Sequence, residues 1–354
     1  MDAQEILKGN EPLKAAALRK TRDISIDSLR GIAVLLMVAG HVIGSASDRG
    51  MDVPDDSAWR YFYVALEDIR MPLFAALSGY IYARRRVWGP EAMGALISGK
   101  VRRLLVPLIT VGAAFLLAQM IIPFSNSEPG LSDFWKMFVY GGEHLWFLQA
   151  MFLIFVFVGA LDMFDVLSTL KRWAIVFGSG SAAFVLVSIP SDANVFSLNG
   201  AIRLLPFFLL GYGLRQFDIT NKNRRILIFC VPMFAAVYTI RLYTVLSSYE
   251  DTNPAMRILE LCVGLFAITA LILLRSYLCS RPLAWLGKYS FSIYLLHLFA
   301  SAGTSKILNQ LGVDSNFTLF LVGMIVAVGF PIIFEKTIGR VNWISWAVLG
   351  QRTR

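Results

Sequence analysis

Residues 29–43 read LRGIAVLLMVAGHVI, and this stretch decides the fold class of the chain. Its only polar side chains are Arg30 and His41, and the apolar character continues to residue 47. A run of this length approaches the roughly 20 residues that an α-helix needs to cross about 30 Å of hydrocarbon. We therefore interpret residues 29–47 as a membrane-spanning helix.

Similar runs recur along the whole chain of 354 residues, which is 56% hydrophobic and only 16% charged, whereas soluble domains carry about 25% charged residues. The further spans that we predict are residues 69–83, 104–124, 144–161, 173–190, 201–214, 226–246, 259–274, 283–302 and 317–338. Two of them, 69–83 and 201–214, are short enough to be re-entrant instead. The sequence thus predicts an all-α, polytopic bundle of about ten transmembrane helices.

The basic residues predict how this bundle is oriented. When alternate loops are assigned to opposite sides, 25 of the 33 Lys and Arg residues fall on one side and 8 on the other. The positive-inside rule makes the first side cytoplasmic, so both termini are expected there. The net charge of +9 is then a feature of topology and not a nucleic-acid-binding surface. We predict a cytoplasmic arm (1–28), a transmembrane domain (29–338) and a cytoplasmic tail (339–354).

The three histidines of the chain all fall in or at the end of a predicted span. His41 lies eleven residues after Arg30, which on an α-helix corresponds to a net rotation of about 20° and a rise of about 16 Å. Arg30 and His41 therefore share one helix face. His144 opens the fourth span and His297 lies within the ninth. Buried polar groups in membranes are usually functional, although a histidine that only bonds a neighbouring helix is the alternative for each.

A second polar feature is the basic loop that we predict between the second and third spans. It carries Arg84, Arg85 and Arg86 at its start and Lys100, Arg102 and Arg103 at its end. Such clusters anchor helices at the cytoplasmic surface or contact anionic lipid. They also bind phosphates through charge-assisted hydrogen bonds. Cys230, Cys262 and Cys279 have no metal-like spacing, and we predict neither a metal site nor a disulfide.

Taken in order, the motifs resemble those of acyltransferase family 3, the membrane-bound O-acyltransferases that act on glycans. The resemblance covers nearly the whole chain and rests on residues 27–31 with His41, 71–80, 100–107, 144–148, 206–212 and 290–297. The Arg–ten residues–His arrangement of Arg30 and His41 is its most specific element. One departure stands out, because the family's Arg-x-x-Arg pair is here Lys100-Val101-Arg102-Arg103.

The resemblance implies transfer of an acyl group, usually acetyl, from cytoplasmic acyl-coenzyme A to a hydroxyl of a cell-envelope glycan or lipid-linked saccharide. It implies no permanently bound cofactor, and it implies the bacterial inner membrane as the location. We expect Arg30 and His41 to be catalytic, with His41 as an uncharged general base. A covalent acyl-histidine is the rival mechanism.

The remaining site predictions divide between donor and acceptor. Arg30, Lys100, Arg102 and Arg103 would bind the coenzyme A phosphates. The acceptor-side or supporting residues would be Asp27, Glu143, His144, Trp146, Ser292, Tyr294 and His297. The alternative functions are a transporter or flippase for an envelope lipid or organic anion, which the absence of an inverted repeat disfavours, and a non-catalytic scaffold.

Overall fold

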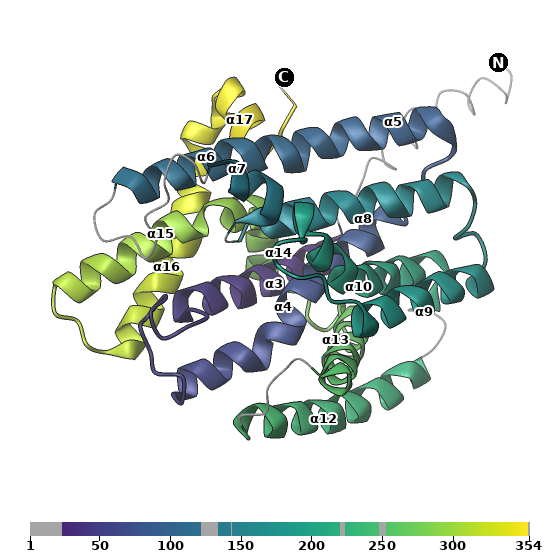
Figure 1. Cartoon of the computed structure of the whole chain (residues 1–354), viewed down its shortest axis with the longest axis horizontal. Coiled ribbons are helices and arrows are strands. Elements are labelled where there is room, and N and C mark those ends of the chain that lie inside the picture. The colour runs from purple at the N-terminus through teal and green to yellow at the C-terminus, as the bar shows by residue number, and fades with distance from the viewer. Residues whose placement is uncertain (1–22, 122–133, 143, 220–223, 248–252, 353–354) are drawn as a thin grey trace, which may run out of the picture.

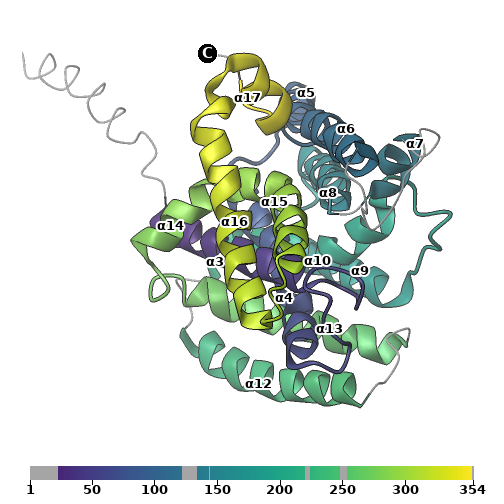
Figure 2. The same ribbon diagram turned by 90° about the vertical axis from the view of Figure 1, so that its left-hand side faces the viewer.

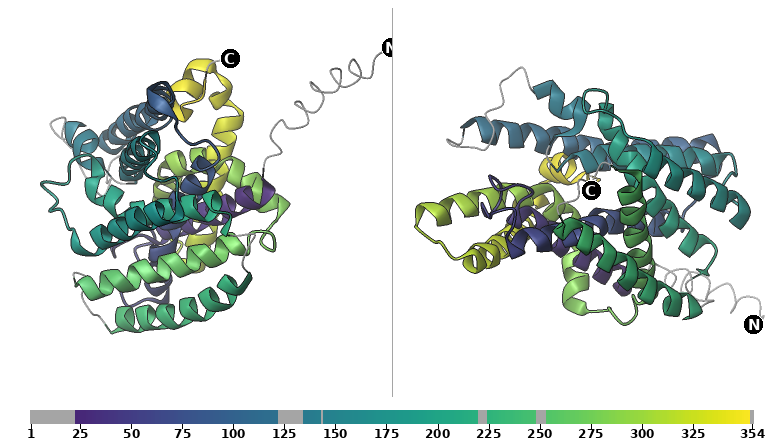
Figure 3. Two further views of the ribbon diagram at one scale, coloured as in Figure 1. Left: turned by 90° about the vertical axis from the view of Figure 1, so that its right-hand side faces the viewer. Right: turned by 60° about the horizontal axis from the view of Figure 1, so that its bottom comes forward.

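The computed structural model describes residues 23–121, 134–142, 144–219, 224–247 and 253–352. Within these ranges the chain is helical and contains no strand. The α-helices are α3 (Ile24–Ile43), α4 (Ala58–Tyr82), α5 (Gly89–Lys100), α6 (Val106–Ile121), α7 (Phe134–Lys136), α8 (Trp146–Met163), α9 (Leu170–Leu186), α10 (Leu198–Gln216), α12 (Arg224–Leu246), α13 (Pro254–Leu273), α14 (Arg281–Lys288), α15 (Ser290–Gln310), α16 (Asn316–Lys336) and α17 (Asn342–Leu349). Helix α3 runs through the middle of the bundle, with α5 and α6 at one edge and α12 at the opposite edge (Figures 1 to 3).

The predicted all-α polytopic membrane fold is confirmed. Each of the ten predicted spans overlaps one long helix, namely α3, α4, α6, α8, α9, α10, α12, α13, α15 or α16. Among the described residues, seven helical segments are long and apolar enough to cross a membrane. The other three predicted spans fall short of that measure because α4 and α15 carry charged and polar side chains and α9 has 17 residues.

Helix α4 is longer than the predicted span 69–83 because it begins at Ala58. Ser57 caps its first turn by accepting a hydrogen bond from the backbone N–H of Arg60 at 3.2 Å. The added turns contain Glu67 and Asp68, whose charges ended the apolar run in the sequence. Helix α4 is thus a continuous helix of 25 residues, and α10, over the other short span, has 19. Their lengths favour spanning helices over re-entrant segments.

The prediction of a basic loop between the second and third spans is wrong for most of the residues concerned. Helix α5 begins at Gly89, with Pro90 in its first turn, and continues through the π-helical turn Val101–Leu105 into α6. The apolar side chains of Met93 and Leu96 explain the difference, because they pack at Gly159 of α8 and hold this segment against the bundle. Arg102 and Arg103 therefore lie in a helical turn.

Glycines in the recognised motifs allow the central helices to approach closely. A Cβ atom at Gly79 of α4 would collide with the carbonyl of Phe208 in α10, and one at Gly211 would collide with that of Ala76. Gly31 of α3 is held in the same way against the carbonyl of Leu283 in α14. These contacts fit the small-residue packing expected of membrane helices. The Gly31 contact holds α3, which carries both Arg30 and His41, closely against α14.

The segment predicted as a cytoplasmic tail is partly helical and packs on the basic end of α6. Thr110 of α6 donates a hydrogen bond to the carbonyl of Ala347 in α17 at 2.6 Å. Arg102 donates another to the carbonyl of Gly350, which has a positive φ of 58°. The carboxyl end of the described chain is thereby attached to the π-helical turn.

Candidate active site

The three histidines converge, although they come from three separate parts of the chain. The ring centroids of His41 and His297 are 4.8 Å apart, those of His144 and His297 are 5.2 Å apart, and those of His41 and His144 are 6.5 Å apart. His41 lies in the last turn of α3, His144 lies two residues before α8, and His297 lies in α15. We call these three side chains the histidine cluster.

Backbone carbonyls orient two of the three rings. His297 Nδ1 lies 3.0 Å from the carbonyl oxygen of Ile293 and 2.9 Å from that of Tyr294, and His144 Nε2 lies 3.2 Å from that of Leu295. The Tyr294 hydroxyl in turn donates a hydrogen bond to the carbonyl of His144. A ring nitrogen beside a carbonyl must carry the proton, so in the neutral imidazoles the other nitrogen is an acceptor.

Those other nitrogens, His297 Nε2 and His144 Nδ1, are buried and have no hydrogen-bond partner among the described residues. Both residues are almost fully buried, with exposures of 0% and 2%. Buried polar atoms are nearly always hydrogen-bonded, so an unsatisfied pair in one place requires an explanation. A bound substrate that supplies hydroxyl donors would provide it.

Two cavities meet at His41. The smaller, of about 380 Å³, is lined by His41, His144, Trp146 and Tyr294 together with charged residues of α4, α10, α12 and α13. The larger, of about 830 Å³, lies between the end of α3, the end of α6 and the second half of α15. His41 and Tyr63 are the residues that line both. Both volumes are in the range of ligand-binding clefts. His41 is therefore accessible from two directions.

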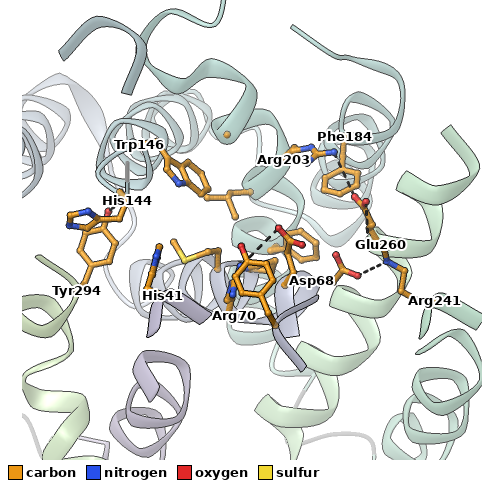
Figure 4. A pocket seen from close by; sticks show the side chains of 17 residues that line it. His41, Asp68, Arg70, His144, Trp146, Phe184, Arg203, Arg241, Glu260 and Tyr294 are labelled. Atoms are coloured by element: carbon orange, nitrogen blue, oxygen red, sulfur yellow. Dashed lines mark hydrogen bonds and ion pairs between the residues drawn. The ribbon is translucent and has the colours of Figure 1, made fainter. Parts of the chain in front are cut away.

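A chain of ion pairs forms the far wall of the smaller cavity (Figure 4). Arg241 Nε lies 3.0 Å from Asp68 Oδ2, and Arg241 Nη2 lies 3.6 Å from Glu260 Oε1. Arg203 Nη2 approaches Glu260 Oε2 at 3.7 Å. This wall was not predicted from the sequence, because Arg203 and Arg241 entered the prediction only among the eight basic residues assigned to the outer side. The available signal was the presence of acidic residues inside apolar segments.

The predicted donor-binding residues lie away from these cavities and have protein contacts. Arg30 Nη1 is 3.2 Å from Asp27 Oδ1 in the same helix. Lys100 Nζ lies 3.2 Å from the ring centroid of Phe155, and Arg102 bonds to Gly350. Neither of the two cavities is lined by Arg30, Lys100, Arg102 or Arg103. These four basic residues therefore line neither of the cavities that meet at His41.

The acceptor-side predictions divide in the structure. His144, Trp146 and Tyr294 line the smaller cavity, and His297 contacts His41 and His144. Ser292 Oγ instead lies 2.9 Å from the carbonyl oxygen of Tyr289 and within hydrogen-bond distance of Glu335 in α16, so its single proton is shared between them or donated to one.

Asp27 pairs with Arg30 near the start of α3, and Glu143 lies outside the described residues. No group of three or more His, Cys, Asp or Glu side chains in the described part of the chain is placed to hold a metal ion.

Comparisons with known proteins identify the family to which the chain belongs. Residues 23–336 match the family described as "Acyltransferase domain". The nodulation protein NolL of Sinorhizobium fredii is 27% identical over 195 residues, which are 54% of this chain and 48% of that protein. NolL of Mesorhizobium japonicum is 25% identical over 195 residues, with 54% and 47% covered.

The chain thus spans about half the length of the curated relatives that it matches. No solved structure matches it. The family match extends from the cap of α3 to the end of α16 and includes all three histidines. The chain belongs to the acyltransferase family represented by that domain.

Proposed function

We propose that this protein is an integral membrane O-acetyltransferase of the bacterial inner membrane, which moves an acetyl group from cytoplasmic acetyl-coenzyme A to a hydroxyl of a cell-envelope or exported glycan. The observation that carries the proposal is the convergence of His41, His144 and His297 where two cavities meet. A buried cluster with unsatisfied ring nitrogens suits proton transfer from a hydroxyl.

His41 is the general base in this proposal. It is the histidine that lines both cavities, so an acceptor hydroxyl in one of them can reach its ring. His297 and His144 accept hydrogen bonds from the substrate through Nε2 and Nδ1 and thereby orient it. Transfer then proceeds when the acceptor oxygen attacks the thioester carbon while His41 takes the hydroxyl proton.

The smaller cavity is the acceptor side of this proposal. Its wall alternates Arg203, Glu260, Arg241 and Asp68, so positive and negative charges are paired along it. Such a wall offers both donors and acceptors to sugar hydroxyls. Trp146 lines the same cavity and presents an aromatic ring on which a sugar face can stack.

The donor approaches from the other end of α3. Arg30, Lys100, Arg102 and Arg103 supply positive charge for the coenzyme A phosphates. The face of α3 between Arg30 and His41 carries Val34 and Met37, which are buried at 0% and 1% exposure. Delivery of the thioester along this face therefore requires the neighbouring side chains to move apart.

The test is labelled acetyl transfer in membranes that contain the protein and envelope glycans. His41→Ala removes the base, and we expect the transfer rate to fall by about 10²- to 10⁴-fold. Cys279→Ser is the control, because Cys279 is an exposed free cysteine and should be neutral. Transfer by His41→Ala at the wild-type rate would remove His41 from the chemistry. Labelled His41 in the absence of acceptor would support the covalent route instead.

A further inference from the structure

Arg70 on α4 has a guanidinium nitrogen that no described residue pairs by a hydrogen bond. The residue is 8% exposed, and its Nη1 atom is buried with no hydrogen-bond partner among the described residues. Its Nη2 atom lies 4.0 Å from Glu67 Oε1, and the guanidinium carbon lies 4.2 Å from the ring centroid of Tyr63. An unpaired N–H of a buried cation is costly, so this atom is placed for an anionic or strongly accepting group.

Arg60 on the same helix shows the contrast. It is buried to a similar degree, at 6% exposure, and its guanidinium carbon lies 5.8 Å from the same Tyr63 ring. Its terminal nitrogens donate hydrogen bonds to the carbonyls of Gly44 and Val53, and Nε lies 3.2 Å from Asp55 Oδ1. Arg60 therefore holds the loop after α3, whereas the Nη1 atom of Arg70 has no such role.

The Nη1 atom of Arg70 lies against Gly40, the residue that precedes His41. A Cβ atom at Gly40 would overlap Arg70 Nη1, so the guanidinium rests against α3 at the residue that precedes His41. Arg70 and His41 both line the smaller cavity, and Figure 4 shows Arg70 between the histidines and the ion-pair wall. Only glycine at position 40 leaves room for this placement. His41 of α3 and the buried cation Arg70 of α4 thus line one cavity, with the guanidinium held at the residue before the histidine.

We infer that Arg70 is a further catalytic residue, which binds the oxyanion formed from the thioester carbonyl. This inference rests on the proposed function. The acceptor oxygen bonds to the carbonyl carbon, His41 takes the hydroxyl proton, and the carbonyl π electrons move onto the oxygen that Arg70 Nη1 binds. The carbonyl then re-forms, the C–S bond breaks, and the coenzyme A thiolate leaves with the proton from His41. A charged donor aimed at this oxygen stabilises the transition state.

The test measures kcat and the KM for acetyl-coenzyme A of the full chain in membranes, with envelope glycans as acceptor. Arg70→Ala should lower kcat by about 10²- to 10³-fold and change the donor KM by less than about threefold. Added guanidinium at non-denaturing concentration should restore part of the rate to this variant. Rescue separates a chemical role from a structural one, because lost packing is not repaired by a soluble cation.

Two variants keep the inference falsifiable if Arg70→Ala folds poorly. Gly40→Ala retains the arginine but displaces its guanidinium, and it should lower kcat in the same direction. Arg60→Lys is the matched control and should leave the kcat of the folded fraction unchanged.

Wild-type kcat in folded Arg70→Ala or in Gly40→Ala would overturn the role of Arg70 and leave the proposed function standing. Wild-type kcat in His41→Ala would overturn the proposed function itself.

Discussion

The histidine cluster and the basic turn, by which we mean Lys100 and the π-helical turn Val101–Leu105 that follows it, are both polar features of one helix bundle, but their contacts differ. In the cluster, His297 Nε2 and His144 Nδ1 have no hydrogen-bond partner in the described part of the chain, and His41 lines two cavities. In the basic turn, Arg102 bonds to Gly350 and Lys100 lies over the ring of Phe155. Under the proposed function, the cluster can act with its present contacts, whereas the basic turn must exchange protein contacts for the donor phosphates.

The largest expected effect concerns the ion-pair wall beside the histidine cluster. Arg241→Ala removes the cation that approaches both Asp68 and Glu260, and Arg241 is only 4% exposed. Breaking such a buried pair should lower the free energy of unfolding by about 3–5 kcal/mol. Denaturant titration in mixed micelles measures this value.

Arg203→Ala is the control for that wall. The Arg203 side chain is 43% exposed and also pairs with Glu260, so its removal should cost about 1 kcal/mol or less. Equal losses for the two variants would show that burial does not distinguish these ion pairs.

The next effect concerns the histidine cluster itself. His297→Phe keeps a ring of similar size in α15 but removes the Nε2 acceptor, and kcat for acetyl transfer should fall by about 100-fold. Thr304→Val is the control, because the Thr304 hydroxyl donates only within the helix, to Ala300 at 2.8 Å. A kcat within twofold of wild type for His297→Phe would reduce His297 to a packing role.

The smallest effect concerns the basic turn. Lys100→Arg replaces a point charge with a planar fork that binds phosphate through two hydrogen bonds, and we expect the donor KM to fall by about threefold. Lys171→Arg, on an exposed side chain at the start of α9, should leave the donor KM unchanged. If Lys100→Arg also left it unchanged, Lys100 would be an anchor and not a donor ligand.

Hydropathy predicted the helices well, because an apolar segment that crosses the membrane must satisfy its backbone N–H and C=O groups with hydrogen bonds inside one helix. The first span shows the limits of this prediction. Helix α3 begins five residues earlier than expected because Asp23 caps it, and it ends at Ile43 because Gly44 adopts a positive φ of 93°. Local hydrogen bonds and backbone conformation set these ends, and hydropathy does not report them.

The candidate site was predictable in part. The free-energy cost of burying a polar side chain drew attention to His41, His144 and His297. Their convergence, however, depends on how α3, α8 and α15 pack. Arg70 was counted only as a charge on the outer side, since nothing in one sequence shows that its guanidinium lies against Gly40. The attachment of Gly350 to Arg102 joins positions 248 residues apart and was equally invisible.

The most direct test of the account compares His41→Ala with Arg102→Gln in one assay of kcat and donor KM. If chemistry occurs at the histidine cluster and donor phosphates bind at the basic turn, His41→Ala lowers kcat with a nearly unchanged donor KM. Arg102→Gln then retains most of kcat but raises the donor KM by about tenfold, because it removes one charge-assisted hydrogen bond to the donor. The opposite result, in which His41→Ala changes the donor KM and Arg102→Gln abolishes kcat, would contradict this assignment of the two regions.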